Sequence, residues 1–154
     1  MEKETITQLL NDLIMINNDR ILGYDKAITN TKGLDTDLKA VYQQMANQSK
    51  NMVAELSIEV EKKGGIKETE TTLSGKVYRI WMDVKATFSG HDRVSSLDAC
   101  EFGEAAIESA YQTVLHVDVE ITADLRKLIM TQHTALNASH DIIRTYLKLN
   151  DAAA

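Results

Sequence analysis

The chain has 154 residues, of which 44% are hydrophobic and only 5% aromatic, so it can build one domain around an aliphatic core. Its formal net charge of -6 excludes the basic surface that neutralises nucleic-acid phosphates, and no nucleic-acid partner is expected. No apolar run approaches the ~20 residues that span a bilayer, and the opening residues show no cleavable signal, so no membrane span is expected.

The composition is typical of a helical protein. There is no proline and there are only seven glycines, so few residues can interrupt long helices. Four segments repeat apolar residues at helical spacing, which predicts a single all-α domain over residues 1–154. The one cysteine, Cys100, excludes an intrachain disulfide and favours a reducing, cytoplasmic location.

The first predicted helix covers residues 5–31. Thr5 and Gln8 have the spacing of a capping box at its start, and Gly33 lies just past its end. Asp19 falls outside the apolar stripe, on another part of the helical wheel. The stripe consists of Ile6, Leu10, Leu13, Asn17, Tyr24 and Ile28.

The second predicted helix covers residues 36–63. Asp35 or Thr36 can cap its start, and Gly64 with Gly65 ends it. Only a few residues link it to the first helix, so these two helices must be antiparallel neighbours. The stripe consists of Leu38, Val41, Met45, Ser49, Met52, Leu56 and Val60.

Nearly thirty residues, about 64–92, separate the second helix from the third, and a connection of this length can cross the whole bundle. Within it, "LSGKVYRIWMDVKATFSG" predicts a short amphipathic helix that Ser74 can cap and Gly90 ends. Its apolar side is expected to pack across the bundle or to form a dimer contact. The interface candidates are Ile80, Trp81, Val84 and Phe88.

The third predicted helix covers residues 92–119 and the fourth covers residues 122–149, where Thr122 and Asp124 supply capping chemistry. Each segment makes a rod of roughly 40 Å, and four such rods predict an antiparallel four-helix bundle of two hairpins joined by the crossover. The third stripe is Leu97, Cys100, Glu104, Ile107, Tyr111 and Val114, and the fourth is Leu125, Leu128, Gln132, Leu136, Ser139 with His140, Ile143 and Leu147.

Polar residues lie on or beside the apolar stripe near the middle of every predicted helix. Four rods of equal length bring their midpoints to one level, so the sequence predicts a polar layer across the centre of the core. A buried carboxylate is costly unless it is protonated, paired, hydrogen-bonded or metal-bound, which makes Glu104 the residue to explain. The layer is expected to contain Asn17, Arg20, Gln48, Ser49, Glu104, Gln132 and His140.

Two interpretations of Glu104 stay open. In the first, it pairs with Arg20 or accepts hydrogen bonds from other residues of the layer, and the network fixes the helix register. In the second, Glu101, Glu104 and His140 hold a divalent metal such as iron, zinc or manganese, since bundle cores bind metals through inward carboxylates and histidines. The spacing favours the first: a di-iron centre requires Glu-x-x-His on two helices, and "NASH" at residues 137–140 has asparagine in place of the glutamate.

Four stretches resemble a known family: "LNDLIMINNDRILGYDKA" at 10–27, "LSGKVYRIWMDVKATFSGHD" at 73–92, "CEFGEAAIESAYQ" at 100–112 and "HDIIR" at 140–144. They are similar to the bacterial family known as domain of unknown function 2383, over about residues 8–148. The resemblance implies a ferritin-like four-helix bundle, bacterial origin and a cytoplasmic setting, without an established activity. Of the superfamily's metal ligands, it implies counterparts only for Glu101 or Glu104, and for His140.

No nucleophile elbow, zinc-protease motif or phosphate-cradling glycine loop is present, so catalysis is not expected. The first functional hypothesis is a non-catalytic, self-associating structural or stress-related protein that forms a homodimer or a higher homo-oligomer without a cofactor. The alternative is a ferritin-like metal binder with a degenerate two-metal site and oxidase chemistry. A third hypothesis is a carrier of a small apolar ligand between the helices.

Overall fold

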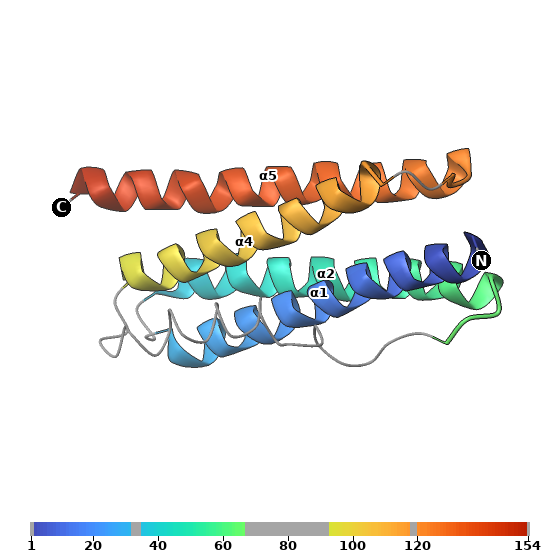
Figure 1. Cartoon of the computed structure of the whole chain (residues 1–154). Coiled ribbons are helices and arrows are strands. Elements are labelled where there is room, and N and C mark those ends of the chain that lie inside the picture. The colour runs from blue at the N-terminus through green and yellow to red at the C-terminus, as the bar shows by residue number, and fades with distance from the viewer. Residues whose placement is uncertain (1, 32–34, 67–92, 118–119, 154) are drawn as a thin grey trace.

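The computed structural model describes residues 2–31, 35–66, 93–117 and 120–153, which form four long helices (Figure 1). They confirm the predicted all-α bundle. Within these ranges, no helix combines the length and the apolar character needed to cross a membrane. The helices are α1 (Glu2–Asn30), α2 (Thr36–Lys62), α4 (Arg93–Leu115) and α5 (Ala123–Ala153).

The helices form a ring in which α1 and α5 each contact both α2 and α4 (Figure 1). α1 runs antiparallel to α2, and α4 runs antiparallel to α5. Arg93 at the start of α4 binds Asp35 and Asp37 at the start of α2, so α2 and α4 run in the same direction. Lys62 and Arg93 therefore lie at opposite ends of the bundle, as the predicted crossover requires. The amphipathic helix predicted inside that crossover, with Ile80, Trp81, Val84 and Phe88, lies outside the described residues.

Two apolar clusters fill the core, one on each side of a central polar layer. The first cluster packs the N-terminal half of α1 against the C-terminal halves of α2 and α4. The second packs the C-terminal half of α1 against the N-terminal halves of α2 and α4. Burial of each large aliphatic side chain contributes about 1.5–3 kcal/mol. The fully buried members include Leu13, Leu56, Ile107 and Leu136 in the first cluster, and Tyr24, Tyr42, Leu97, Cys100 and Ile143 in the second.

Two helix ends show the local chemistry that the sequence predicts. The hydroxyl of Thr122 accepts a hydrogen bond of 3.2 Å from the main-chain N–H of Leu125, which caps the start of α5. After α2, Gly64 adopts a φ of 74°, a left-handed conformation that favours glycine. At Gly65, an added Cβ would lie 2.5 Å from Cγ2 of Thr7, so only glycine permits this close approach to α1.

One local prediction in the first part of the chain is wrong, and two residues there have contacts that the sequence did not indicate. Thr5 is not a cap, because α1 already begins at Glu2, where acidic residues favour a helix N-terminus. Asp35 is the N-cap residue of α2, as predicted, but its side chain makes no capping hydrogen bond, and its carboxylate pairs with Arg93 at 3.1 Å. Asp19, which lies outside the apolar stripe, is also fully buried, because the middle of α1 is covered on more than one side, as the burial of Met15 also shows.

Candidate functional site

An ion pair between Arg20 of α1 and Glu104 of α4 occupies the centre of the bundle, and both side chains are fully buried. Nη2 and Nε of Arg20 lie 2.8 and 2.9 Å from the same carboxylate oxygen, Oε1. The hydroxyl of Tyr24 donates a short hydrogen bond to that oxygen as well. Among the described residues, the other oxygen, Oε2, has no hydrogen-bond partner.

The rest of the Arg20 guanidinium binds α2. Its Nη1 donates to the main-chain oxygen of Met45 at 3.2 Å, to Oε1 of Gln48 at 2.8 Å and to Oγ of Ser49 at 2.9 Å. Burial, followed by the charge of Glu104, raises the pKa of Tyr24 well above its usual value, so its hydroxyl keeps the proton that it donates. One arginine thus joins α1 to both of its neighbours in the ring.

A chain of hydrogen bonds carries the polar layer across the bundle to α5. Asn17 accepts a bond of 2.8 Å from Ser49 and donates one of 2.9 Å to the hydroxyl of Tyr111. Tyr111 donates in turn to Oε1 of Gln132 at 2.6 Å, and burial raises its pKa. Nε2 of Gln132 donates to Glu55 at 3.2 Å. The polar layer therefore reaches all four described helices.

A second polar cluster lies on the seam between α4 and α5. The ring of His140 is only 1% exposed, and its Nε2 lies 2.6 Å from Glu101 while its Nδ1 lies 3.0 Å from Glu108. A neutral imidazole donates from one nitrogen only, so the ring donates to both carboxylates only while it is protonated. Arg144 adds a contact of 3.5 Å to the other oxygen of Glu101.

The structure divides the residues of the predicted polar layer between these two clusters. Six of them belong to the Arg20 network: Asn17, Arg20, Ser49 and Glu104, which are fully buried, Gln132, which is 2% exposed, and Gln48, which is half-buried. The seventh, His140, is buried but bonds to Glu101 and Glu108 instead. Sequence reasoning did not assign polar roles to Tyr24, Glu55, Tyr111 and Ser139, although the tyrosine hydroxyls on an apolar stripe were a usable signal.

The predicted metal ligands are also divided. Glu101 touches His140, whereas Glu104 is engaged by Arg20 and Tyr24. In the part of the chain that the structure describes, no three His, Cys, Asp or Glu side chains form a group that could hold a metal ion. A guanidinium at the centre supplies positive charge there and repels any further cation. These donors do not fit the two-metal centre that the ferritin-like resemblance suggests.

Residues 5–117 match the family described as "Domain of unknown function (DUF2383)". A search of curated proteins finds no match. Among solved structures, a mutant of Dps1 from Mycobacterium smegmatis is similar with a TM-score of 0.81 at 13% identity, covering 95% of this chain and 97% of that chain. At this low identity the likeness shows the fold alone, a ferritin-like four-helix bundle. The chain belongs to the DUF2383 family.

Proposed function

We propose that this chain is a non-catalytic, self-associating ferritin-like protein of the cytoplasm, with a structural or stress-related role. The observation that carries the proposal is the buried ion pair between Arg20 and Glu104. This pair and the hydrogen bonds around it engage the polar groups of the central layer with one another. Few of those groups stay free to act on a substrate.

A structural role follows from the geometry of the layer. A buried ion pair adds little stability compared with apolar packing, but it can specify one arrangement of the helices. The acceptors of Arg20 lie on α2 and α4, so all of them meet the guanidinium in only one register. Sliding α1 by a single turn, about 5.4 Å, would break every one of these contacts. The polar layer therefore fixes the register of α1 relative to α2 and α4.

Self-association is supported by the outward face of α5. Six of its exposed residues between 131 and 149 are uncharged and follow one another at helical spacing along about five turns, beside the exposed charges of Asp141, Arg144 and Lys148. Exposed large apolar side chains on such a face mark interaction sites. Ile142 is 41% exposed and Leu149 is 62% exposed. We call this face the α5 outer stripe; it consists of Thr131, Thr134, Ala138, Ile142, Thr145 and Leu149.

The charges beside the α5 outer stripe suit a second copy of the chain. Lys127 and Asp141 are exposed and lie seven residues before and seven residues after Thr134. When two copies of α5 pack antiparallel about Thr134, Lys127 of one copy meets Asp141 of the partner subunit, and this pair occurs twice. In this antiparallel arrangement, residues 127 and 141 face opposite charges and not like charges.

Sedimentation velocity tests this interface. Wild type is expected to sediment as a homo-oligomer, and Ile142→Glu is expected to shift it to a smaller species by placing a charge in the contact. Ile58→Glu is the matched control, because Ile58 is an isoleucine of α2 that is 53% exposed outside the stripe. A monomeric wild type would contradict self-association, and an oligomeric Ile142→Glu would exclude the α5 outer stripe.

A single metal ion at the α4–α5 seam is a second candidate function. The observation that favours it is the contact of 2.6 Å between Glu101 and His140, two residue types that bind zinc, iron and manganese. Dialysis against each ion, followed by metal analysis, tests it. Stoichiometric metal that is lost in His140→Ala would support the metal binder, whereas no uptake by wild type removes this candidate.

A further inference from the structure

The acceptors around Arg20 have the chemistry of a metal-ion shell. The guanidinium lies within 3.2 Å of a carboxylate oxygen of Glu104, an amide oxygen of Gln48, a hydroxyl of Ser49 and the main-chain oxygen of Met45. These four oxygen types are the ligands that hard divalent cations prefer. They come from two helices and surround the fully buried guanidinium, Glu104 on the side of Nε and Nη2 and the other three at Nη1.

The charge of this buried group is balanced by the protein itself. Arg20 contributes one positive charge and Glu104 one negative charge, and burial makes either charge costly without the other. Oε2 of Glu104 has no hydrogen-bond partner among the described residues, so the carboxylate still has an oxygen available. Removal of the guanidinium would leave four oxygens lining the space that it occupied, together with an unbalanced negative charge.

We propose that Arg20 is a built-in cation that takes the place of a metal ion, and that removing its guanidinium turns these oxygens into a divalent-cation site. In the wild-type chain the guanidinium fills this space and keeps ions out. The inference rests on the proposed structural role of the polar layer, and it adds the chemical reason why that layer needs no metal. It also explains how a ferritin-like core is held together without the paired Glu-x-x-His motifs.

The test compares Arg20→Ala with the wild-type chain in thermal unfolding and in electron paramagnetic resonance, with Mn²⁺ as the probe. Arg20→Ala is expected to melt at a lower temperature than wild type without Mn²⁺. Mn²⁺ at about a hundred times its dissociation constant is expected to raise that melting temperature by roughly 5–10 °C and to give a bound-ion spectrum. The double variant Arg20→Ala/Glu104→Gln is expected to lose both effects.

Arg126→Ala is the matched control, because the guanidinium that it removes donates to the main-chain oxygen of Leu115 at 3.2 Å, away from both polar clusters. It is expected to gain no Mn²⁺ site. A folded Arg20→Ala that does not bind Mn²⁺ would overturn the inference and leave the proposed function standing. If Arg20→Ala does not fold even with Mn²⁺, Arg20→Gln is measured instead, and absence of binding there overturns the inference equally. Binding by wild type that depends on Glu104 would overturn both the inference and the proposed function.

Discussion

At the scale of single residues, the chemistry of the core depends on the Glu104 carboxylate. One of its oxygens receives three donors, two from Arg20 and one from Tyr24. Charge-assisted hydrogen bonds of this kind are about twice as strong as neutral ones, and the low dielectric of the core strengthens them further. The same low dielectric makes each partner costly when the other is missing.

Glu104→Gln is therefore expected to be strongly destabilising. The substitution leaves the guanidinium of Arg20 buried without its counter-charge, and breaking a buried ion pair in this way costs about 3–5 kcal/mol. Urea unfolding measures the loss. The control is Glu59→Gln, which removes a surface contact of 3.6 Å to the exposed Lys62 and should cost less than about 1 kcal/mol. Equal losses in both variants would mean that the buried pair contributes no more than a surface pair.

The sequence predicted which residues form the polar layer better than it predicted which of these residues bind each other. Helical spacing was enough to place Asn17, Ser49 and Glu104 on buried faces, because burial depends only on the angle around the helix. Which residues pair depends on how two helices are rotated and shifted along their axes relative to each other. The apolar stripe of one helix carries no information about either quantity. For this reason Arg20 was only one of several predicted partners of Glu104, and the hydroxyl of Tyr24 was missed.

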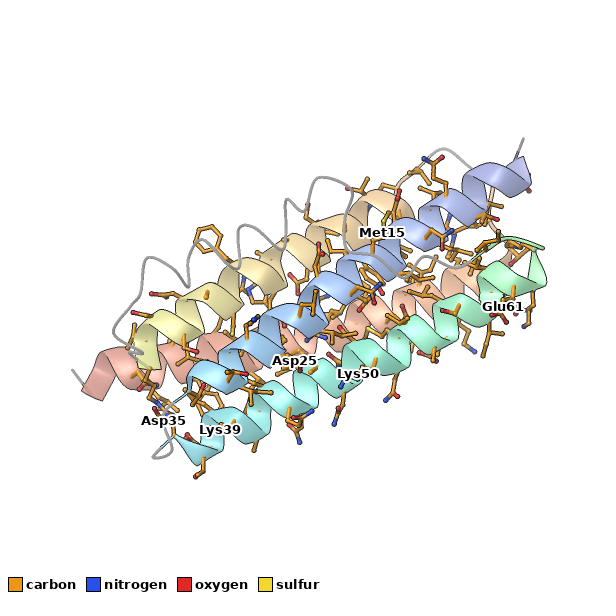
Figure 2. All side chains as sticks on the ribbon, turned by 90° about the horizontal axis from the view of Figure 1, so that it is seen from below. Met15, Asp25, Asp35, Lys39, Lys50 and Glu61 are labelled. Carbon is orange, nitrogen blue, oxygen red and sulfur yellow. The ribbon has the colours of Figure 1, made fainter. Side chains whose placement is uncertain are left out.

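At the scale of helices, Arg93 joins three helix ends. It opens α4, where its guanidinium binds Asp35 at 3.1 Å and Asp37 at 2.6 Å, both at the start of α2. Its Nε donates to Asn150, near the end of α5, at 2.9 Å. Figure 2 shows Asp35 at this end of the bundle. Because these contacts are partly exposed, we expect them to orient the helix ends more than to stabilise them.

The pair of Arg93 with Asp37 predicts a specific acid sensitivity. The hydrogen bonds from Arg93 lower the pKa of Asp37 below its usual value. A lowered carboxyl pKa contributes stability that is present above the unfolded value, about 3.9, and is lost as pH falls through the folded value. In Arg93→Met the pKa of Asp37, followed by NMR, is expected to rise, and unfolding should depend less on pH below about 4. An unchanged pKa would show that Arg93 does not bind Asp37 in solution.

The helices themselves were predictable because each depends on local signals. The period of apolar residues predicted the C-terminal end of α2 to within one residue. Gly64 supplies the left-handed turn there. The start of α1 was missed by three residues, since its first residues are good helix formers and a capping pattern at Thr5 is only one way to begin a helix. The burial of Asp19 was missed because it depends on which faces of α1 are covered by the rest of the chain. The apolar period of α1 does not give that information.

At the scale of the whole molecule, tyrosines connect the two apolar clusters to the polar layer. Tyr24 and Tyr42 belong to one cluster and Tyr111 belongs to the other, and their hydroxyls bind Glu104, Ser96 and Gln132, respectively. Each ring therefore packs as an apolar group, while the hydroxyls of Tyr24 and Tyr111 bind residues of the polar layer and that of Tyr42 binds Ser96 outside it. In all three, burial is the main cause of a raised pKa.

These three raised pKa values predict that the bundle unfolds in alkali. A folded-state pKa above the unfolded value, about 10, means that stability is complete below pH 10 and falls as pH rises further. Each buried tyrosine contributes about 1.4 kcal/mol per pH unit, so three together give a slope of about 4 kcal/mol per unit. Because a domain is stable by only about 5–15 kcal/mol, unfolding is expected within a few units above pH 10.

Ultraviolet absorbance of tyrosinate and circular dichroism, recorded during one alkaline titration, measure this effect. Three of the five tyrosines are expected to ionise only together with the loss of helix. Tyr42→Phe removes one of the three, so the slope of stability against pH above 10 should fall by about one third. Ionisation of all five before any loss of helix would mean that water reaches these rings in the folded state. That result would contradict a core closed on both sides of the polar layer, since each cluster contains at least one of these tyrosines.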